Sequence, residues 1–222
     1  MAKLIVIEGT DASGKQTQSE LLYEYFKSKN TKVLKLCFPD YESPSSSLVK
    51  MYLGGEFGET ADSVDGKIAS IFYASDRYAS YKTKWESVAR EEDAVIIFDR
   101  YVTSNMIHQA VKVKDQSQKD AFLDWLYELE YGIFQLPRPD YVIFLKMPPE
   151  TARNLMKNRA NKITHEAEKD IHEADPHYLE ACFQNACYVA EKYDWTVIPC
   201  VKDGVLRSIE EIQEEIRDTV CN

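Results

Sequence analysis

The stretch LIVIEGTDASGKQT, residues 4–17, decides the fold because an apolar run passes directly into a glycine-bounded loop. Its first four residues are all aliphatic, which is typical of a strand that is covered on both faces. The loop from Gly9 to Lys15 fits the pattern G-x-x-x-x-G-K, and a stretch with helical periodicity follows it. Strand, loop and helix in this order predict a phosphate-binding loop at the edge of a parallel sheet.

The residue types of this loop suit a polyphosphate. Gly9 and Gly14 allow the backbone to curl, so that N–H groups can point at phosphate oxygens. The start of the following helix adds a partial positive charge, and Lys15 adds a full charge near the β- and γ-phosphates. The alternative is a glycine turn beside a surface lysine. The predicted nucleotide-binding residues are Gly9, Thr10, Ala12, Ser13, Gly14, Lys15, Gln16 and Thr17.

Four further apolar runs repeat the strand pattern along the chain, at residues 33–38, 95–98, 141–145 and 196–199. Stretches of helical period lie between and after them, at residues 15–29, 64–90, 104–110, 118–134, 149–158, 176–193 and 208–219. Strands that alternate with helices in this way form parallel sheets. We therefore expect an α/β protein with the three-layer P-loop NTPase fold, in which helices flank a five-stranded parallel sheet.

Two segments depart from this alternation. Residues 40–60 contain Pro44, a serine run and several glycines, so we expect a long loop there. Residues 158–175 are dense in charged side chains and poor in apolar ones, which predicts a polar lid outside the core. No repeat or linker divides the chain, so residues 1–222 are expected to form a single domain that includes this lid.

The charge balance limits the partners. The 222 residues contain 27 Lys and Arg against 37 Asp and Glu, a formal net charge of −10. Such a chain lacks the basic surface that duplex nucleic acid requires, so a phosphate ligand needs cations concentrated in one cleft. Five cysteines without a C-x-x-C pair, and no run apolar enough for a secretion signal or a membrane span, predict a cytoplasmic protein. Neither a nucleic acid polymer nor a membrane is expected as a partner.

A second acidic element follows the third apolar run. Asp99 comes directly after residues 95–98 and Arg100 follows it, so a carboxylate and a cation lie at the carboxyl end of a strand. Sheets of this kind bind their ligands at that edge. In enzymes with a phosphate-binding loop, an acid at this place holds Mg²⁺ directly or through water. An ion pair at the strand end is the alternative.

The residue after the loop lysine is usually Ser or Thr, whose hydroxyl binds Mg²⁺, but here it is Gln16. An amide oxygen is also a hard, neutral ligand and could bind the metal directly or through a water. Gln16 could instead be an exposed helix residue, and the Thr17 hydroxyl could bond a phosphate. The sequence thus predicts a bound nucleotide and Mg²⁺, with Gln16 and Asp99 as the metal ligands.

Three motifs together resemble a known family. GTDASGK at residues 9–15, FPDY at 38–41 and DRYVTSN at 99–105 look like those of thymidylate kinases, which phosphorylate thymidine 5′-monophosphate (dTMP) with ATP. The resemblance covers nearly the whole chain, from residue 4 to the last predicted strand. It implies transfer of the γ-phosphoryl group of ATP to dTMP, with ATP and Mg²⁺ as cofactors. It also implies a homodimer, with residues 64–90 as our expected interface.

The resemblance assigns roles to the matching residues. Asp11 would bond the 3′-hydroxyl of the acceptor, Arg100 would grip its phosphate, and Asp99 would lie near its nucleophilic oxygen and the metal. Tyr73 would stack on the thymine and Arg77, one helical turn later, would hydrogen-bond a base carbonyl. The alternative makes Tyr73 ordinary core and Arg77 a surface residue. The other implied acceptor contacts are Phe38, Pro39, Ser104, Asn105, His108 and Gln109.

Two of these positions differ from the family pattern. His108 stands where the family has Tyr or Phe crowding the 2′ position of the sugar, and it could equally be an ordinary helix residue. Ala12 stands where some members carry an arginine that stabilises the transferring phosphoryl group, so a lid cation is expected to do so. Arg153 and Arg159 are the preferred candidates for that role, ahead of Lys157 and Lys162, although charged helix faces are usually only solvated. With these two arginines, the predicted catalytic residues are Asp11, Lys15, Asp99, Arg100, Arg153 and Arg159.

Two rival functions remain open at the level of the sequence. A deoxynucleoside kinase of the same fold would take the unphosphorylated nucleoside, and Arg100 argues against it because a monophosphate needs a cation for its extra charge. A nucleotide-dependent switch without turnover is the other rival. A guanine-reading switch should carry N-K-x-D, and residues 161–164 lack its aspartate.

Overall fold

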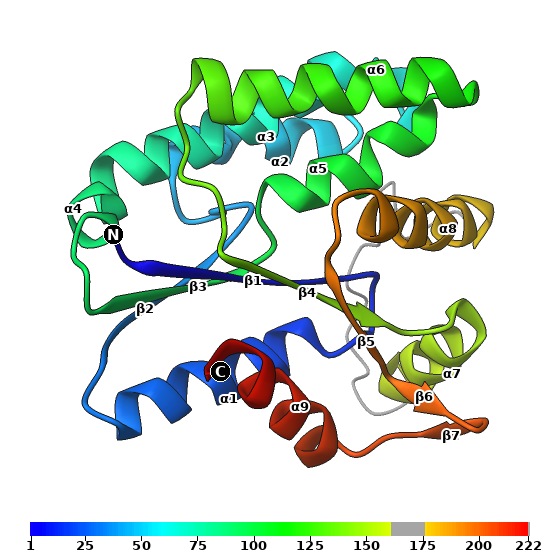
Figure 1. Cartoon of the computed structure of the whole chain (residues 1–222). Helices are drawn as coiled ribbons and strands as arrows, with labels where there is room; N and C mark the ends of the chain where they lie inside the picture. The colour runs from blue at the N-terminus through cyan, green and yellow to red at the C-terminus, as the bar shows by residue number, and fades with distance from the viewer. Residues whose placement is uncertain (161–175, 222) are drawn as a thin grey trace.

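The computed structural model describes residues 1–160 and 176–221, and its centre is a sheet between two layers of helices (Figure 1). The five strands are parallel, in the order β2-β3-β1-β4-β5. This confirms the predicted three-layer α/β fold, and every predicted strand end lies within two residues of the observed one. The strands are β1 (Lys3–Gly9), β2 (Lys32–Cys37), β3 (Ala94–Asp99), β4 (Tyr141–Lys146) and β5 (Thr196–Pro199).

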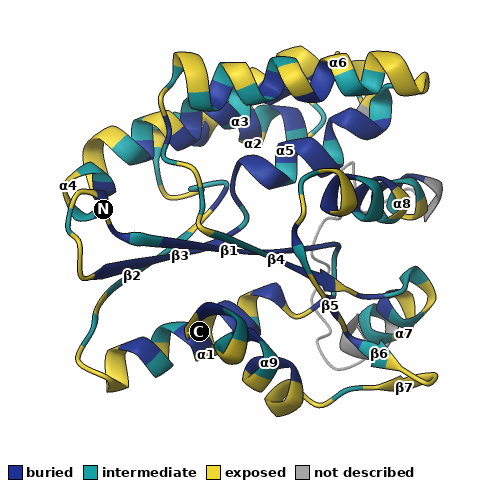
Figure 2. Cartoon of the chain, viewed as in Figure 1, coloured by how far each residue is buried: buried dark blue, intermediate teal, exposed yellow. Residues whose placement is uncertain are grey.

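The central strands are apolar because helices cover both of their faces. Every residue of β3 is buried, as is every residue of β1 after the first, and Figure 2 shows both strands dark along most of their length. Chain reversals in a parallel sheet take place over its faces, so water meets neither side. The uniform Val, Ile and Phe content of these runs follows from that environment.

One face of the sheet is covered by α1 (Lys15–Ser28), α7 (Pro149–Ala160) and α9 (Ile209–Cys221). Leu22 of α1 and Ile216 of α9 are fully buried against strand residues such as Ile97. Helix α9 begins with a capping box, in which Ser208 Oγ accepts from the Glu211 N–H and the Glu211 carboxylate accepts from the Ser208 N–H.

The other face carries the remaining α-helices of the described chain. They are α2 (Ser47–Leu53), α3 (Gly66–Ser80), α4 (Glu86–Ala89), α5 (Val102–His108), α6 (Gln116–Tyr127) and α8 (Pro176–Lys192). Short helical turns join some of them, namely η1 (Pro44–Ser46), η2 (Ala61–Ser63), η3 (Tyr81–Trp85), η4 (Ala110–Lys112) and η5 (Glu128–Ile133). Below these helices Phe98, Tyr101 and Trp85 form an aromatic core, with Phe98 stacked on Tyr101 at 4.5 Å between ring centroids.

The expectation of a long loop over residues 40–60 is wrong, because η1 and α2 lie within it. Val49 and Tyr52 of α2 are fully buried, and Tyr52 packs with Val64 and Ala69 in a small separate core. The residues of α2 itself, SLVKMYL, are mostly good helix formers, and its buried face packs against α3. The serines and glycines that suggest a loop lie around this short helix.

Three smaller differences concern two divided helices and one additional hairpin. The single helix predicted at 64–90 is divided into α3, η3 and α4, and that at 118–134 into α6 and η5. A short hairpin of β6 (Val201–Lys202) and β7 (Val205–Leu206) has no counterpart among the predicted elements. Most of the predicted lid at 158–175 lies outside the described residues, since α7 runs to Ala160.

The strand order determines where a ligand can bind. From β1 the chain first builds the sheet toward β3 and β2, and later toward β4 and β5 on the other side. A crevice forms at the carboxyl ends of the strands where the direction changes. The loop after β1 and the Asp99–Arg100 pair at the end of β3 both lie at this crevice. None of the described helices is both long and apolar enough to cross a membrane.

Candidate active site

The loop between β1 and α1 has the curled backbone that its glycines predict. Gly14 has φ 88°, in the left-handed region, directly before the first residue of α1. Gly9 is needed for a different reason, since a Cβ atom there would lie 2.5 Å from Ser13 Oγ. That hydroxyl is buried and has no hydrogen-bond partner among the described residues. The loop thus closes so tightly that a side chain at position 9 would have to displace Ser13 and press against the Leu145 carbonyl oxygen.

Lys15 is held inside this loop. Its Nζ donates a hydrogen bond to the Thr10 carbonyl oxygen at 2.8 Å, and the residue is only 8% exposed. Burial lowers the pKa of Lys15 to about 8, with a further contribution from repulsion by Arg100. A nearby anion would stabilise the charged form, so the loop is ready for a ligand that brings negative charge.

Asp99 and Gln16 are the predicted metal ligands, and the chemistry of their side chains is compatible with Mg²⁺. The Asp99 carboxylate has no hydrogen bond or ion pair to the parts of the chain that are described, and Gln16 is exposed on the first turn of α1. Both offer hard oxygen donors. No group of three or more acidic, His or Cys side chains within residues 1–160 and 176–221 could enclose a metal. Such a pair suits an ion that completes its coordination with water and phosphate oxygens.

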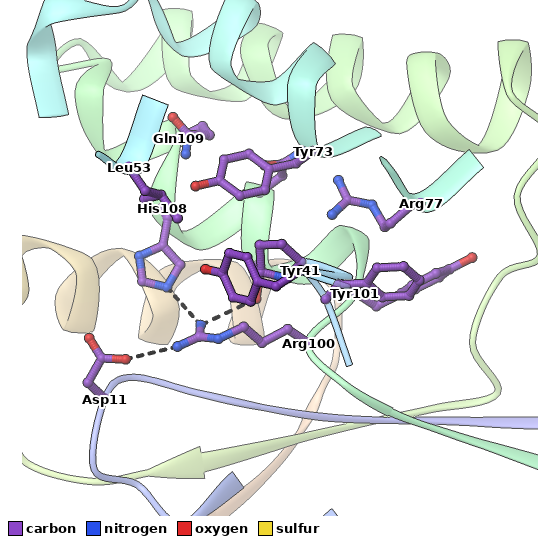
Figure 3. A pocket seen from close by; sticks show the side chains of 13 residues that line it. Asp11, Tyr41, Leu53, Tyr73, Arg77, Arg100, Tyr101, His108 and Gln109 are labelled. Atoms are coloured by element: carbon purple, nitrogen blue, oxygen red, sulfur yellow. Dashed lines mark hydrogen bonds and ion pairs between the residues drawn. The ribbon is translucent and has the colours of Figure 1, made fainter. Parts of the chain in front are cut away.

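Arg100 lies at the centre of the crevice (Figure 3). Its Nη2 donates to Asp11 Oδ1 at 2.9 Å, and its Nη1 bonds His108 Nε2 at 3.1 Å. Burial alone would lower its pKa, but attraction to Asp11 and Glu8 outweighs this effect and raises the pKa above its ordinary value. Arg100 also has φ 69°, which places an arginine in the left-handed backbone region. This backbone conformation brings its side chain over the loop that follows β1.

Asp11 is kept ionised by its neighbours. Burial by itself would raise its pKa, but attraction to Arg100 and Lys15 outweighs this and lowers the pKa below the ordinary value. The carboxylate is therefore an acceptor of hydrogen bonds at the entrance of the crevice.

Glu8, the residue before the loop, was not singled out from the sequence. Its carboxylate is fully buried and accepts hydrogen bonds from the hydroxyls of Thr103 and Ser104, both at 2.8 Å. Its Oε1 also lies 3.8 Å from Arg100 Nη1. Glu8 thus ties the end of β1 to the start of α5 and contributes charge beneath Arg100. An acid at the end of an apolar strand, as at Asp99, was the available signal.

All ten predicted acceptor-binding residues line one pocket of about 240 Å³. It extends from Asp11 and Arg100 to Tyr73 and Arg77, between α3 and α5 (Figure 3). The remaining predicted members of its wall are Phe38, Pro39, Ser104, Asn105, His108 and Gln109. Sequence reasoning missed Tyr41, Leu53 and Tyr101, which also line it.

Arg77 is not the surface residue of the alternative interpretation. Its side chain is 2% exposed and forms a double hydrogen bond with the carboxylate of Glu130, with Nε to Oε2 at 2.6 Å. Burial opposes its charge, but attraction to Glu130 outweighs this and raises the pKa of Arg77. A charged group can remain at this depth because its counter-ion is buried with it.

His108 is held on both sides of its ring. Because a guanidinium can only donate, its Nε2 accepts from Arg100 and its Nδ1 carries the proton. That Nδ1 lies 3.5 Å from the Sγ of Cys182 on α8, whose pKa burial raises to about 12. The histidine thus contacts Arg100 on one side of its ring and Cys182 on the other.

Of the predicted lid cations, only Arg153 has a side chain within the described part of the chain. Arg153 on α7 is exposed and lines a narrow cleft together with Thr10 and Asp11, so it reaches the phosphate-binding loop. The side chains of Lys157 and Arg159, and all of Lys162, fall outside the described part of the chain.

Comparison with known proteins identifies the family of the chain. Residues 7–198 match the family model described as thymidylate kinase. The chain belongs to the thymidylate kinase family. It is 34% identical over 160 residues to the thymidylate kinase of Mycobacterium tuberculosis, covering 72% of each chain. The thymidylate kinase of Plasmodium falciparum is 28% identical over 157 residues, which cover 68% of this chain and 65% of that protein.

The family also appears among solved structures. A thymidylate kinase from Candida albicans superposes with a TM-score of 0.69 at 20% identity, over 99% of this chain and 91% of that one. At this identity the match shows a shared fold. The span of residues that the family model matches contains both the phosphate-binding loop and the pocket-lining helices α3 and α5.

Proposed function

We propose that this protein transfers the γ-phosphoryl group of ATP to the 5′-phosphate of dTMP, producing dTDP and ADP. The observation that carries the proposal is one continuous site. A phosphate-binding loop with a buried lysine opens at Asp11 and Arg100 into a pocket whose far end holds Tyr73 and Arg77. Its two ends suit a polyphosphate and a planar base, respectively. Family membership supports the same reaction.

The chain's own groups would act mainly by positioning and by neutralising charge. Lys15 and the loop N–H groups would hold the β- and γ-phosphates. Arg100 would turn from Asp11 to the acceptor phosphate, and Asp11 would then accept from the 3′-hydroxyl. A phosphate oxygen of dTMP is already ionised at neutral pH, so no side chain has to act as a general base. Mg²⁺, held by Asp99 and Gln16, would neutralise charge on the transferring group.

The acceptor pocket offers the contacts that a nucleoside needs. Phe38 packs on Phe98 and forms a rigid floor, with Pro39 beside it, while Tyr73 presents its ring from α3. Gln109 has a buried Oε1 without a hydrogen-bond partner in the described residues, so it can accept from a ligand or a water. His108 and Ser104 lie beside Arg100, where we place the sugar and its phosphate.

Arg153 is our candidate for a cation that stabilises the transferring phosphoryl group, because it shares a cleft with the loop residues Thr10 and Asp11. Arg159 remains a second candidate on the same helix. We assign the whole chain to one domain with a lid at 158–175. All five cysteines are unpaired, which supports action in a reducing compartment such as the cytoplasm.

The decisive assay compares two acceptors. With ATP and Mg²⁺, release of ADP is expected to be at least ~10² times more efficient in kcat/KM for dTMP than for thymidine, since only dTMP engages Arg100. A preference for thymidine would instead assign a deoxynucleoside kinase. Absence of ADP release with every nucleoside monophosphate would leave only a nucleotide-binding switch.

We also propose that the protein forms a homodimer through α3. Ile68, Ile71 and Tyr78 lie on one face of this helix and are 50%, 42% and 42% exposed. An apolar helix face of this kind is typical of an interface. We expect light scattering to give a dimer for the wild type and a monomer for Ile71→Glu, because burying a carboxylate there is costly. Ile209→Glu, an equally exposed position on α9, is the control and should remain dimeric. A monomeric wild-type protein would contradict the proposal.

A further inference from the structure

A buried carboxylate lies behind the base end of the pocket. Glu130 is on η5, more than fifty residues beyond Arg77 in the chain, and is fully buried. Its two oxygens accept from the Nε and Nη2 of Arg77, and Oε1 also accepts from Asn105 Nδ2 at 3.0 Å. One acid thus holds two side chains that line the pocket, although it does not line the pocket itself.

The contacts of Glu130 determine which way the Asn105 amide faces. Its Nδ2 donates to Glu130 and, at 3.2 Å, to the carbonyl oxygen of Ser70. Both partners can only accept, and an NH₂ group has two hydrogens, so both are used. The amide oxygen Oδ1 is therefore the group that Asn105 can offer to a ligand, and it is an acceptor.

The same carboxylate leaves Arg77 as a donor. Its Nε and Nη2 are directed at Glu130, whereas Nη1 makes no hydrogen bond within residues 1–160 and 176–221. The guanidinium is presented to the pocket close to Tyr73 (Figure 3). The base end therefore offers one donor and one acceptor, both fixed by a single acid.

We propose that Glu130 is a positioning residue that sets the polarity with which this site reads the base, so that it accepts a carbonyl beside a ring N–H. The inference rests on the proposed function. Arg77 donates to O4 of thymine or uracil, and Asn105 Oδ1 accepts from N3–H. Cytosine presents the reverse pattern, an amino group and an unprotonated N3, so both contacts would be mismatched. Mismatched polar groups in a buried site give strong discrimination.

A neutral residue at position 130 could not hold Arg77 and Asn105 in these orientations. Glutamine has one acceptor oxygen, whereas Arg77 and Asn105 together direct three N–H groups at this position. In Glu130→Gln the new NH₂ group must face one of these donors. Either Arg77 is displaced or the Asn105 amide rotates, and the fixed polarity is lost in both cases.

The test measures base readout directly. Glu130→Gln and Glu130→Asp are compared with the wild type using dTMP, dUMP, and the 5-methyl-2-pyrimidinone analogue of dTMP, which lacks O4 and the N3 proton. The wild type should favour dTMP over this analogue by about 10²-fold in kcat/KM, and both variants should reduce this ratio to about tenfold or less. The dTMP to dUMP ratio should not change, because these bases share the edge being read. KM for dTMP should rise about tenfold while KM for ATP stays constant.

Glu128→Gln is the matched control, since Glu128 is exposed on the same turn and the charge change is identical. It should behave as the wild type. Breaking a buried ion pair can impair folding, but substrate ratios and KM do not depend on the fraction of folded enzyme, and Glu130→Asp keeps the charge. An unchanged ratio in both Glu130 variants would show a purely structural role. Failure of the wild type to phosphorylate dTMP would refute the proposed function itself.

Discussion

Replacing Lys15 by methionine is expected to lower kcat by about 10³-fold or more and, at the same time, to make the fold more stable. The loss of activity follows because the positive charge of the loop lysine is removed from the transferring phosphates. The gain in stability follows from burial, which lowers the pKa of Lys15 to about 8 in the folded protein. An ammonium group that is costly to bury is replaced by an apolar side chain of similar length.

The gain in stability from Lys15→Met should decrease as the pH rises. The folded pKa of Lys15 lies below its unfolded value, so the buried charge destabilises the wild type fully below about pH 8. This penalty disappears as the pH rises from about 8 to the unfolded value of about 10.4. After allowance for the lost hydrogen bond to Thr10, the advantage of Lys15→Met at pH 7 is on the order of 2 kcal/mol.

Thermal melts of both proteins at pH 7 and pH 10 check the prediction, with a rise in Tm of roughly 5 °C expected at the lower pH. Calorimetric titration with dTMP is the control and should give the same Kd for both, because Lys15 does not line the acceptor pocket. A variant that melts below the wild type at pH 7 would contradict the argument from burial.

Replacing Arg100 by methionine is expected to lower kcat/KM for dTMP by about 10³-fold. Arg100 is the cation that we assign to the acceptor phosphate, and within residues 1–160 and 176–221 no other cationic side chain lines the pocket at that end. The substitution also leaves the carboxylates of Asp11 and Glu8 without their shared counter-charge. We therefore expect a less stable protein as well, in contrast to the Lys15 variant.

Thymidine separates the two effects of this substitution. As an inhibitor it lacks the phosphate, so its Ki should be nearly the same for the wild type and Arg100→Met if the arginine grips the phosphate. Arg100→Lys keeps the charge but loses the planar guanidinium. Its kcat/KM for dTMP should therefore lie between those of the wild type and Arg100→Met. A parallel rise in the Ki of thymidine would mean that Arg100 only maintains the shape of the pocket.

The features that could be predicted from the sequence are those that neighbouring residues determine. An apolar run that is covered on both faces has the same composition wherever it lies in the sheet, so all five strands were found. The loop from Gly9 to Lys15 carries its conformational requirements in its own glycines. The acceptor residues came from the family resemblance, and the structure brings them into one pocket.

The features that could not be predicted depend on contacts between distant segments. Tyr52 of α2 is buried against Ala69 of α3, and residues 40–60 alone do not predict that contact. Glu130 is one of many acidic residues on helical stretches, and only the fold places it behind Arg77. The left-handed backbone of Arg100 is likewise invisible in its sequence context.

The left-handed backbone conformation of Arg100 matters for any attempt to make the enzyme more stable. Non-glycine residues with positive φ are the usual places where a change to glycine relaxes the chain, and Asn30, Asp194 and Asp203 belong to this group. Arg100 would be chosen by the same criterion. An engineer guided by backbone geometry alone would thus remove the guanidinium that joins the two halves of the reaction site.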